Sequence, residues 1–168
     1  AKENWKLNDF KKVNLLIDNY TNTFVPNVFF QEENKENYLK LLSRDEIHHI
    51  QTDKLKTIDA VNIYCLKEDI ATLSSQFSEK ISVLHNSTIL IESLVKEFSQ
   101  RNQEVRAFVN VKNNKYELTI INNSTLIFHN YFNFNTKEDF LYFILFTFEQ
   151  LKIDNETIPL YFMGFIEE

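Results

Sequence analysis

The chain contains a single glycine, Gly164, among its 168 residues. Glycine adopts positive φ and lets a ligand approach the backbone closely, so phosphate-binding loops and dinucleotide-binding turns need several glycines at fixed spacing. Neither G-x-x-x-x-G-K-[ST] nor G-x-G-x-x-G can be written in this sequence. The common glycine-rich phosphate sites are therefore excluded, and the turns of the fold must be built from other residues.

The composition indicates a globular protein that does not bind nucleic acid. Hydrophobic residues make up 43% of the chain and 16 residues are phenylalanine, whereas disordered chains contain few aromatic residues. The net charge is −6, and the three arginines, Arg44, Arg101 and Arg106, are scattered. Because nucleic-acid affinity comes largely from lysines and arginines that neutralise phosphates, we expect no nucleic-acid partner. The same charge opposes binding to anionic membrane surfaces.

The single cysteine, Cys65, lies in a strand-like run, residues 59–66, with no histidine near it in the sequence. One cysteine cannot form an intramolecular disulfide, so we interpret it as a buried structural thiol in a reducing compartment; a thiol nucleophile or a metal ligand is the alternative. No signal peptide is visible, and the longest apolar stretch, residues 140–148, is far shorter than the ~20 residues of a membrane-spanning helix. We expect a cytoplasmic protein with no membrane insertion.

The first half of the chain predicts alternating strands and helices. A strand, a helix and another strand in succession form a parallel crossover, so the pattern predicts a parallel sheet with both faces covered. Residues 45–57 show no clear pattern. The predicted elements are a strand at 13–17, an extended stretch ending at 28–30, a helix at 32–42, strands at 60–66 and 80–84, and helices at 68–77 and 87–100.

The second half predicts an antiparallel meander followed by a helix and a strand. The turns of the meander are rich in asparagine, which tolerates left-handed backbone better than other non-glycine residues. Thr136 and Asp139 have the spacing of a capping box, so we expect a helix from there to Leu151. Its apolar residues leave little polar face, which predicts burial on most sides. The predicted strands are 105–111, 116–121 and 125–134, and a last strand at 158–165 that is apolar enough for burial on both faces.

Five groups of motifs are spread over nearly the whole chain. They are Thr23-Phe-Val-Pro26 with Val28-Phe-Phe30, Asp59-Ala-Val-Asn-Ile-Tyr64, His85-Asn-Ser-Thr88 with Ile91-Glu92, Phe132-Asn-Phe-Asn-Thr136 with Glu138-Asp-Phe-Leu-Tyr142, and Pro159-Leu-Tyr-Phe-Met-Gly164. Together they resemble a family of uncharacterised proteins, mainly from Bacteroidetes, described as having an actin-like ATPase fold. The resemblance implies an α/β protein of ribonuclease-H-like architecture, with a strand–helix alternating first lobe followed by a three-stranded antiparallel meander, a helix and a parallel strand.

The change of pattern between the halves predicts one compact α/β unit with two lobes, residues 1–102 and residues 103–168. Family members are longer, with strands before the equivalent of Ala1 and more chain after the equivalent of Glu168. We therefore expect this chain to be a central portion of such a protein. The first lobe would then be incomplete at its N-terminus and the second at its C-terminus.

The resemblance places a nucleotide site at two points of the second lobe. In actin-like ATPases the turn between the first two strands of that lobe carries an acidic residue, glycine and hydroxyl residues that hold metal and phosphate. The matching stretch, residues 109–115, has none of these. The adenosine-side motif usually pairs glycines after a late strand, where this chain has one glycine followed by phenylalanine. The candidate nucleotide-binding residues are Asn110, Lys112, Lys115 and Gly164; the alternative is that both lysines are solvated at a hairpin tip.

A second candidate lies where a strand meets a helix. Asn86, Ser87 and Thr88 bring amides and hydroxyls to a helix N-terminus, a position that binds anions or simply caps the helix. Glu138 and Asp139 occupy the first turn of another helix, where carboxylates stabilise the dipole. Because adjacent residues point to different faces, these two carboxylates are not a general acid and base pair.

The four histidines give weaker signals. His48 and His49 are adjacent, so both cannot easily face one metal; Asp45, Glu46 and Asp53 could complete a site, but surface positions are the favoured interpretation. His85 and His129 lie on or beside strands and are interpreted as core or edge histidines. We therefore predict neither catalytic nor metal-binding residues.

The favoured function is that of a non-enzymatic protein with a degenerate actin-like fold that binds a protein partner and needs no cofactor. Aromatic residues in excess of what one core can bury would supply the partner surface. We expect that surface around Phe128, Tyr131, Phe132 and Phe134; the alternative is that these rings fill the core or face segments outside this chain. The alternative is an actin-like nucleotide-binding protein or ATPase, using ATP with Mg, whose completing residues lie outside this chain.

Overall fold

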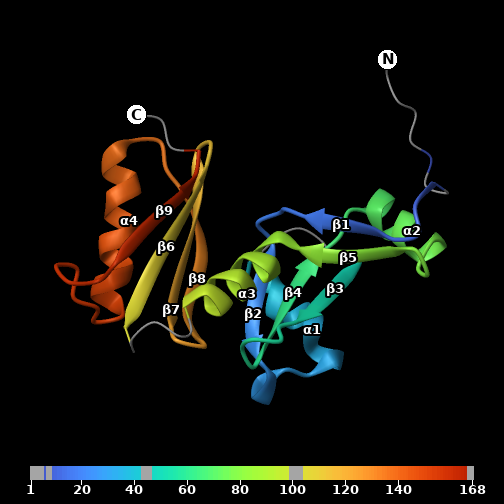
Figure 1. Cartoon of the computed structure of the whole chain (residues 1–168), viewed down its shortest axis with the longest axis horizontal. Helices are drawn as coiled ribbons and strands as arrows, with labels where there is room; N and C mark the ends of the chain where they lie inside the picture. Colours follow the sequence, from blue (N-terminus) through green and yellow to red (C-terminus); the bar gives the residue numbers. More distant parts are fainter. Residues whose placement is uncertain (1–5, 7–8, 43–46, 99–103, 166–168) are drawn as a thin grey trace. The chain divides into compact units, whose positions relative to one another are not determined.

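The computed structural model describes residues 6, 9–42, 47–98 and 104–165 (Figure 1). The chain divides into two compact units, residues 1–92 and 93–168. The predicted lobe boundary at residues 102 and 103 lies outside the described residues. Among the helices that are described, none is long and apolar enough to span a membrane.

The first unit contains two small sheets instead of one parallel sheet. Its strands are β1 (Val13–Ile17), β2 (Asn22–Pro26), β3 (Ile50–Lys54), β4 (Ala60–Cys65) and β5 (Ile81–His85). β1 and β5 pair in parallel, and β4 lies between β2 and β3, antiparallel to both. The predicted crossover from β4 to β5 within one sheet is therefore wrong. β4 is buried over almost its whole length, so it takes the centre of its own sheet, while β5 pairs with a strand far earlier in the chain.

Short helices connect these strands. They are the 3-10 turns η2 (Asn27–Phe29) and η3 (Glu32–Asn34), and the helices α1 (Lys35–Lys40) and α2 (Glu68–Gln76), with α3 (Asn86–Phe98) running on into the second unit. The extended stretch ends at Pro26, the last residue paired with β4, because proline has no N–H to continue a ladder. The helix predicted at 32–42 forms as a 3-10 turn followed by α1. Leu39 of α1 is fully buried beside Val25 and Val61.

The second unit confirms the predicted meander. Its strands are β6 (Val105–Lys112), β7 (Lys115–Asn122), β8 (Thr125–Asn133) and β9 (Leu160–Gly164), in the sheet order β8-β7-β6-β9. β6, β7 and β8 are antiparallel neighbours, and β9 lies parallel to β6. Asn113 and Asn123 have φ of 44° and 52°, so asparagine supplies the left-handed backbone that glycine usually provides in such turns.

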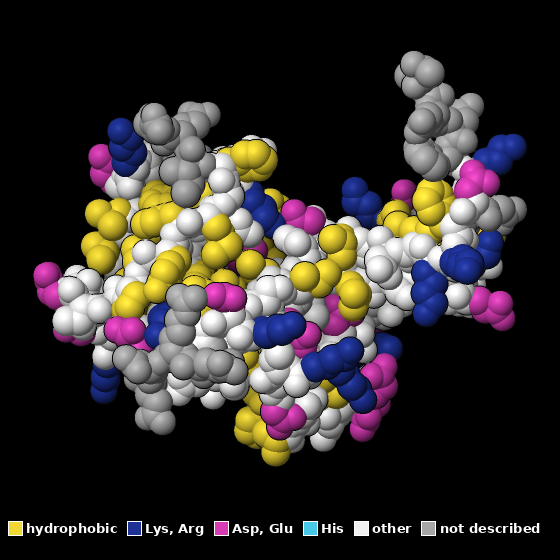
Figure 2. Space-filling model, in the orientation of Figure 1, with side chains coloured by type: hydrophobic (Ala, Val, Ile, Leu, Met, Phe, Trp, Pro, Cys, Tyr) yellow, Lys and Arg dark blue, Asp and Glu magenta, His cyan; other side chains and the backbone are white. Residues whose placement is uncertain are grey.

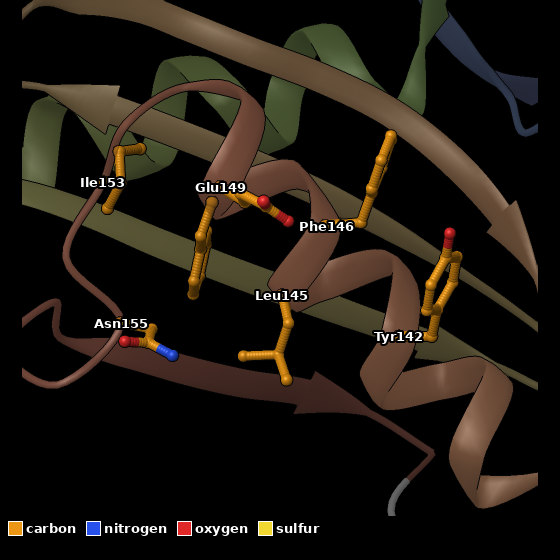
Figure 3. A pocket seen from close by; sticks show the side chains of 7 residues that line it. Tyr142, Leu145, Phe146, Glu149, Ile153 and Asn155 are labelled. Atoms are coloured by element: carbon orange, nitrogen blue, oxygen red, sulfur yellow. The ribbon is translucent and has the colours of Figure 1, made fainter.

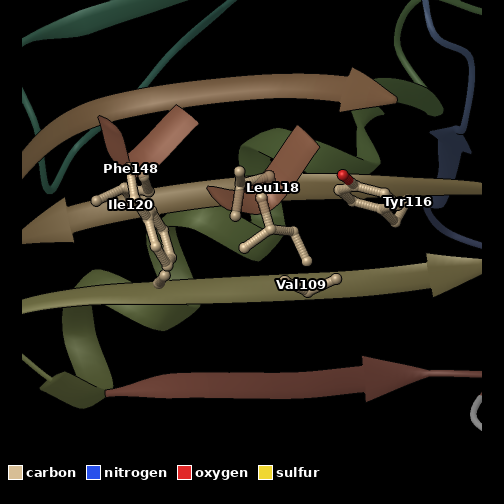
Figure 4. Close-up of a cluster of buried hydrophobic side chains, with 7 residues drawn as sticks. Val109, Tyr116, Leu118, Ile120 and Phe148 are labelled. Carbon is tan, nitrogen blue, oxygen red and sulfur yellow. The ribbon is translucent and has the colours of Figure 1, made fainter. Parts of the chain in front are cut away.

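Helix α4 (Lys137–Gln150) covers one face of this sheet. Its predicted capping box is present: the Thr136 hydroxyl accepts from the Asp139 N–H, and the Asp139 carboxylate accepts from the Thr136 N–H. Val109, Tyr116, Leu118 and Phe148 are buried between α4 and the strands (Figure 4).

Two predictions of burial fail in this unit. Only one side of α4 is buried, and on its other side large apolar side chains are exposed. β9 is partly exposed, and it lies at the edge of the described sheet with β6 as its one neighbour among the described strands. By contrast, the half-buried Phe128, Phe132 and Phe134 pack against the core. The exposed aromatic surface therefore lies on α4 and β9, not on β8 where the sequence predicts it.

Candidate functional site

The only glycine of the chain lies where β9 approaches β6. Gly164 is the register partner of Val111 and has φ +89°. A Cβ at this position would lie 2.2 Å from the Val111 carbonyl oxygen and 2.8 Å from Asn110 Oδ1. The next residue, Phe165, donates its backbone N–H to the same carbonyl at 2.9 Å. Close strand packing and the left-handed backbone therefore explain the glycine without any ligand.

On the sheet face opposite α4, polar residues surround a buried carboxylate. Glu117 is the register partner of Asn110 and its side chain is fully buried. Asn110 Nδ2 donates to Glu117 Oε2 at 3.2 Å, and Lys112 Nζ lies 3.9 Å from the same oxygen. A buried carboxylate needs a counter-charge or hydrogen-bond donors. The amide and ammonium groups predicted to face a nucleotide are thus bound to a carboxylate of the same chain.

His129 completes this cluster in its neutral form. Its Nε2 lies 3.6 Å from Glu117 Oε1, and its Nδ1 is hydrogen-bonded to the Thr119 hydroxyl at 3.1 Å. Burial, followed by the positive charge of Lys112, lowers the pKa of His129 to about 3. The ring is therefore uncharged at neutral pH, and Lys112 is the cation that balances Glu117. His129 is a core histidine, as its place beside a strand indicated.

The structure brings three of the four predicted nucleotide residues together. Asn110, Lys112 and Gly164 share one corner of the sheet, and Lys115 pairs with Lys112 across the two-residue hairpin. Glu117, the residue that connects them, was missed by sequence reasoning. The sequence does contain a sign of it: Glu117 is a single carboxylate between Tyr116 and Leu118, in a strand that has a neighbour on each side in the meander.

The predicted anion site at the start of α3 belongs to a second buried network. Ser87 and Thr88 are buried, and the Ser87 N–H donates to the ring Nδ1 of His85 at 3.2 Å. Thr88 Oγ1 donates to Asp53 Oδ2 at 2.8 Å and accepts from the Asn62 amide at 2.9 Å. Asn86 is half-buried in the first turn of the helix. The Ser87 N–H and the Thr88 hydroxyl therefore bind residues of β3, β4 and β5.

Asp53 of β3 is the centre of that second network. It accepts from the Tyr64 hydroxyl at 2.9 Å, from the His85 backbone N–H at 2.8 Å and from Thr88. Burial, and then the charge of Asp53, raise the pKa of the Tyr64 hydroxyl, so it stays protonated and acts as a donor. Asn62 also connects the network to β2, because its Oδ1 accepts a hydrogen bond from Asn22 Nδ2 at 3.0 Å. The network therefore links both sheets of the first unit to α3.

The histidine pair lies at a small surface cavity. A cavity of about 250 Å³ is lined by His48, His49, Cys65 and Glu68 among others, and His49 Nε2 contacts the Glu68 carboxylate. Burial raises the pKa of the Cys65 thiol, which does not favour a thiolate nucleophile or ligand. Within the described ranges, no three His, Cys, Asp or Glu residues are arranged to hold a metal ion. The other proposed ligands, Asp45 and Glu46, lie outside those ranges.

A known protein family matches the entire chain. The family is described as "Protein of unknown function (DUF3822)", and its model covers residues 1–168. This chain belongs to the DUF3822 family. A comparison with curated proteins finds no match.

The DUF3822 chain is similar to a solved protein from Bacteroides thetaiotaomicron VPI-5482, described as having an actin-like ATPase fold and unknown function. The TM-score is 0.83 at 22% sequence identity, over 95% of this chain and 62% of that protein. At this identity the likeness establishes the fold alone, and it confirms the predicted actin-like architecture. The chain spans 62% of the length of that neighbour.

Within the DUF3822 chain, the hairpin of β6 and β7 stands where the predicted phosphate-binding turn would be. Its side chains carry one buried anion, Glu117, and one cation within 4 Å of it, Lys112, at 3.9 Å. Any phosphate approaching this corner must compete with a carboxylate that is already held there. Chemically, the described side chains of this corner neutralise an internal charge.

Proposed function

We propose that this chain is a non-catalytic protein with a degenerate actin-like fold that acts by binding another protein. The observation that carries the proposal is the contact of Asn110 and Lys112 with the buried carboxylate of Glu117. In a working site these positions would face the phosphates of a nucleotide. Here an internal carboxylate takes the place of the ligand anion, so the chain stabilises this corner without one.

Gly164 supports the same proposal. In the related fold, glycines after a late strand leave space for adenine. In this chain the space beside Gly164 is filled by the Val111 carbonyl and the Asn110 side chain. The following Phe165 is held by its N–H to Val111. We therefore propose that the chain needs neither ATP nor Mg.

Contact with a protein partner is supported by the exposed apolar surface of the second unit. Hydrophobic side chains gather over α4 and β9 (Figure 2). A contiguous apolar patch is uncommon on a monomeric protein that has no partner. The net charge of −6 and the single cysteine suit a partner that is not a nucleic acid, in a reducing, cytoplasmic compartment.

Thermal unfolding with and without Mg-ATP tests the loss of nucleotide binding. A ligand that binds only the native state raises the unfolding midpoint. We expect no shift of the midpoint at millimolar Mg-ATP and no phosphate release on prolonged incubation. A nucleotide-binding protein of actin-like fold in the same buffer serves as the positive control.

A midpoint raised by Mg-ATP would contradict the proposal if the rise disappeared in Lys115→Ala. The matched control is Lys137→Ala, which removes one exposed lysine from the start of α4 in the same unit. A rise that both variants retain would also contradict it, because the nucleotide would then bind at a site other than the hairpin.

A further inference from the structure

The solvent face of α4 is apolar in its middle and acidic at both ends. Tyr142 is 58% exposed and Phe146 is 44% exposed, with Leu145 between them. Residues separated by three, four, seven or eleven positions share one face of a helix. Glu138 precedes Tyr142 by four positions and Leu145 by seven, and Glu149 follows them by seven and four. The two glutamates therefore lie at the two ends of the same face of the helix. Both glutamates are exposed. We call Glu138, Tyr142, Leu145, Phe146 and Glu149 the α4 stripe.

A cavity lies beside this stripe. It measures about 450 Å³ and is lined by Tyr142, Leu145, Phe146, Phe148, Glu149, Ile153 and Asn155. Figure 3 shows the apolar side chains of α4 on one side and Ile153 and Asn155, from the segment after α4, on the other. The mainly apolar lining of the cavity suits apolar side chains of a partner. Glu149 supplies a carboxylate at its edge.

The charges at the ends of the stripe decide against a second copy of this chain as the occupant. Two copies packed antiparallel through α4 would place Glu138 of one against Glu149 of the other. Two copies packed parallel would place each glutamate against its own equivalent. Both symmetric arrangements bring carboxylates together, and each copy carries a net charge of −6. Neither glutamate forms an ion pair with another described residue.

We propose that the α4 stripe and its cavity bind an amphipathic helix of another protein, with an apolar stripe flanked by lysine or arginine. A helix laid along an apolar surface is a common mode of peptide recognition, read by apolar residues at helical spacing. Basic residues at the two ends of that helix would meet Glu138 and Glu149, and complementary charge sets orientation and partner choice. This inference rests on the proposed function, because it names the kind of partner.

Selection from a displayed library of helical peptides tests the proposal. The library has a fixed leucine stripe, and its flanking positions are drawn from lysine, glutamate and serine. On the full chain we expect lysine to be enriched over glutamate about tenfold or more at the flanking positions, as charge complementarity requires. On the variant Glu138→Lys with Glu149→Lys, we expect the preference to reverse toward glutamate.

The selected peptide is then synthesised, and its affinity is measured by fluorescence anisotropy. Phe146→Glu should weaken binding about tenfold or more, because it places a charge in the middle of the stripe. The control Leu41→Glu places the same charge at an 89% exposed leucine of the first unit and should leave the affinity unchanged. Circular dichroism confirms that each variant is folded.

Three results would overturn the proposal. First, the wild-type chain selects no peptide more strongly than the Phe146→Glu variant does. Second, lysine is still enriched when the selection is made on the charge-reversed variant. Third, the wild-type chain forms a dimer in sedimentation that Phe146→Glu dissociates. Mg-ATP binding is measured on the same samples. If no basic-flanked peptide is selected and Mg-ATP does not bind, only this inference is overturned. If Mg-ATP binds, the proposed function is overturned.

Discussion

Among the described residues, each unit buries one carboxylate, and the two are stabilised in different ways. Asp53 in the first unit accepts from two hydroxyls and a backbone N–H. Glu117 in the second unit lies near the ammonium group of Lys112 and accepts from the Asn110 amide. The first carboxylate, on β3, thus connects β4, β5 and α3 by hydrogen bonds from neutral donors. The second is bound to Asn110 and Lys112, two of the residues predicted from the sequence to face a nucleotide.

This difference separates a network of neutral donors from a cluster that contains an ion pair. Polar residues placed to support a fold tend to satisfy each other through neutral hydrogen bonds, as they do around Asp53. A cation beside a buried carboxylate is costlier to assemble, because both charges lose solvation. The Lys112–Glu117 pair is therefore the feature that supports our proposal for this corner.

The largest expected effect is the loss of Asp53. Asp53→Ala leaves three buried donors without an acceptor and should lower the free energy of unfolding by about 3 to 5 kcal/mol. Urea denaturation measures this change. If that variant does not fold, Tyr64→Phe removes one donor only and should cost about 1 kcal/mol. The control Glu79→Ala, at an exposed turn, should stay within about 0.5 kcal/mol of the wild type. If Asp53→Ala leaves the free energy of unfolding unchanged, the Asp53 network does not stabilise the first unit, and the contrast between the two networks is lost.

A smaller effect is expected from Lys112→Met. It leaves the Glu117 carboxylate without its cation and should destabilise the chain by about 2 to 3 kcal/mol. Combining it with Glu117→Gln should restore part of that loss, because neither charge then remains. Urea denaturation of the two single variants and the double variant gives the coupling energy. Strictly additive losses would show that Lys112 and Glu117 act independently.

The smallest effect concerns pH. The pKa of His129 is lowered to about 3 in the folded chain, while an unfolded histidine has a pKa near 6.5. Between these values the unfolded state binds the additional proton, so stability is complete above pH 6.5 and falls as the pH drops toward 3. His129→Gln should remove about 2 kcal/mol of the stability difference between pH 7 and pH 5. Equal pH profiles for the two proteins would place the titrating group elsewhere.

The features that the sequence predicted well depend on neighbouring residues. The asparagine turns of the meander and the capping box of Thr136 and Asp139 involve residues two to four positions apart. The pairing of β1 with β5 could not be predicted in this way, because it joins strands more than 60 positions apart, as Val13 and Ile81 show. Alternation of strands and helices does not specify which strands become neighbours.

The candidate site was predicted in part for the same reason. Asn110, Lys112 and Gly164 were identified from their places in a resemblance, but their surroundings depend on sheet register. Glu117 faces Asn110 only because β6 and β7 pair with a two-residue turn; a slip of one residue would move its side chain to the other face. The apolar residues of α4 predicted burial, yet apolarity alone does not show whether the chain itself supplies the covering surface.

The edge position of β9 has a consequence for the behaviour of the protein in solution. Residues 160–164 form a short, uncharged, aromatic-containing strand that pairs on one side only among the described strands. Such an edge is a template for pairing with the same edge of another molecule. Pro159 before the strand lacks an N–H, and Gly164, with its left-handed backbone, ends the strand. Pairing of this edge with another molecule would therefore be limited to the five residues that Pro159 and Gly164 leave.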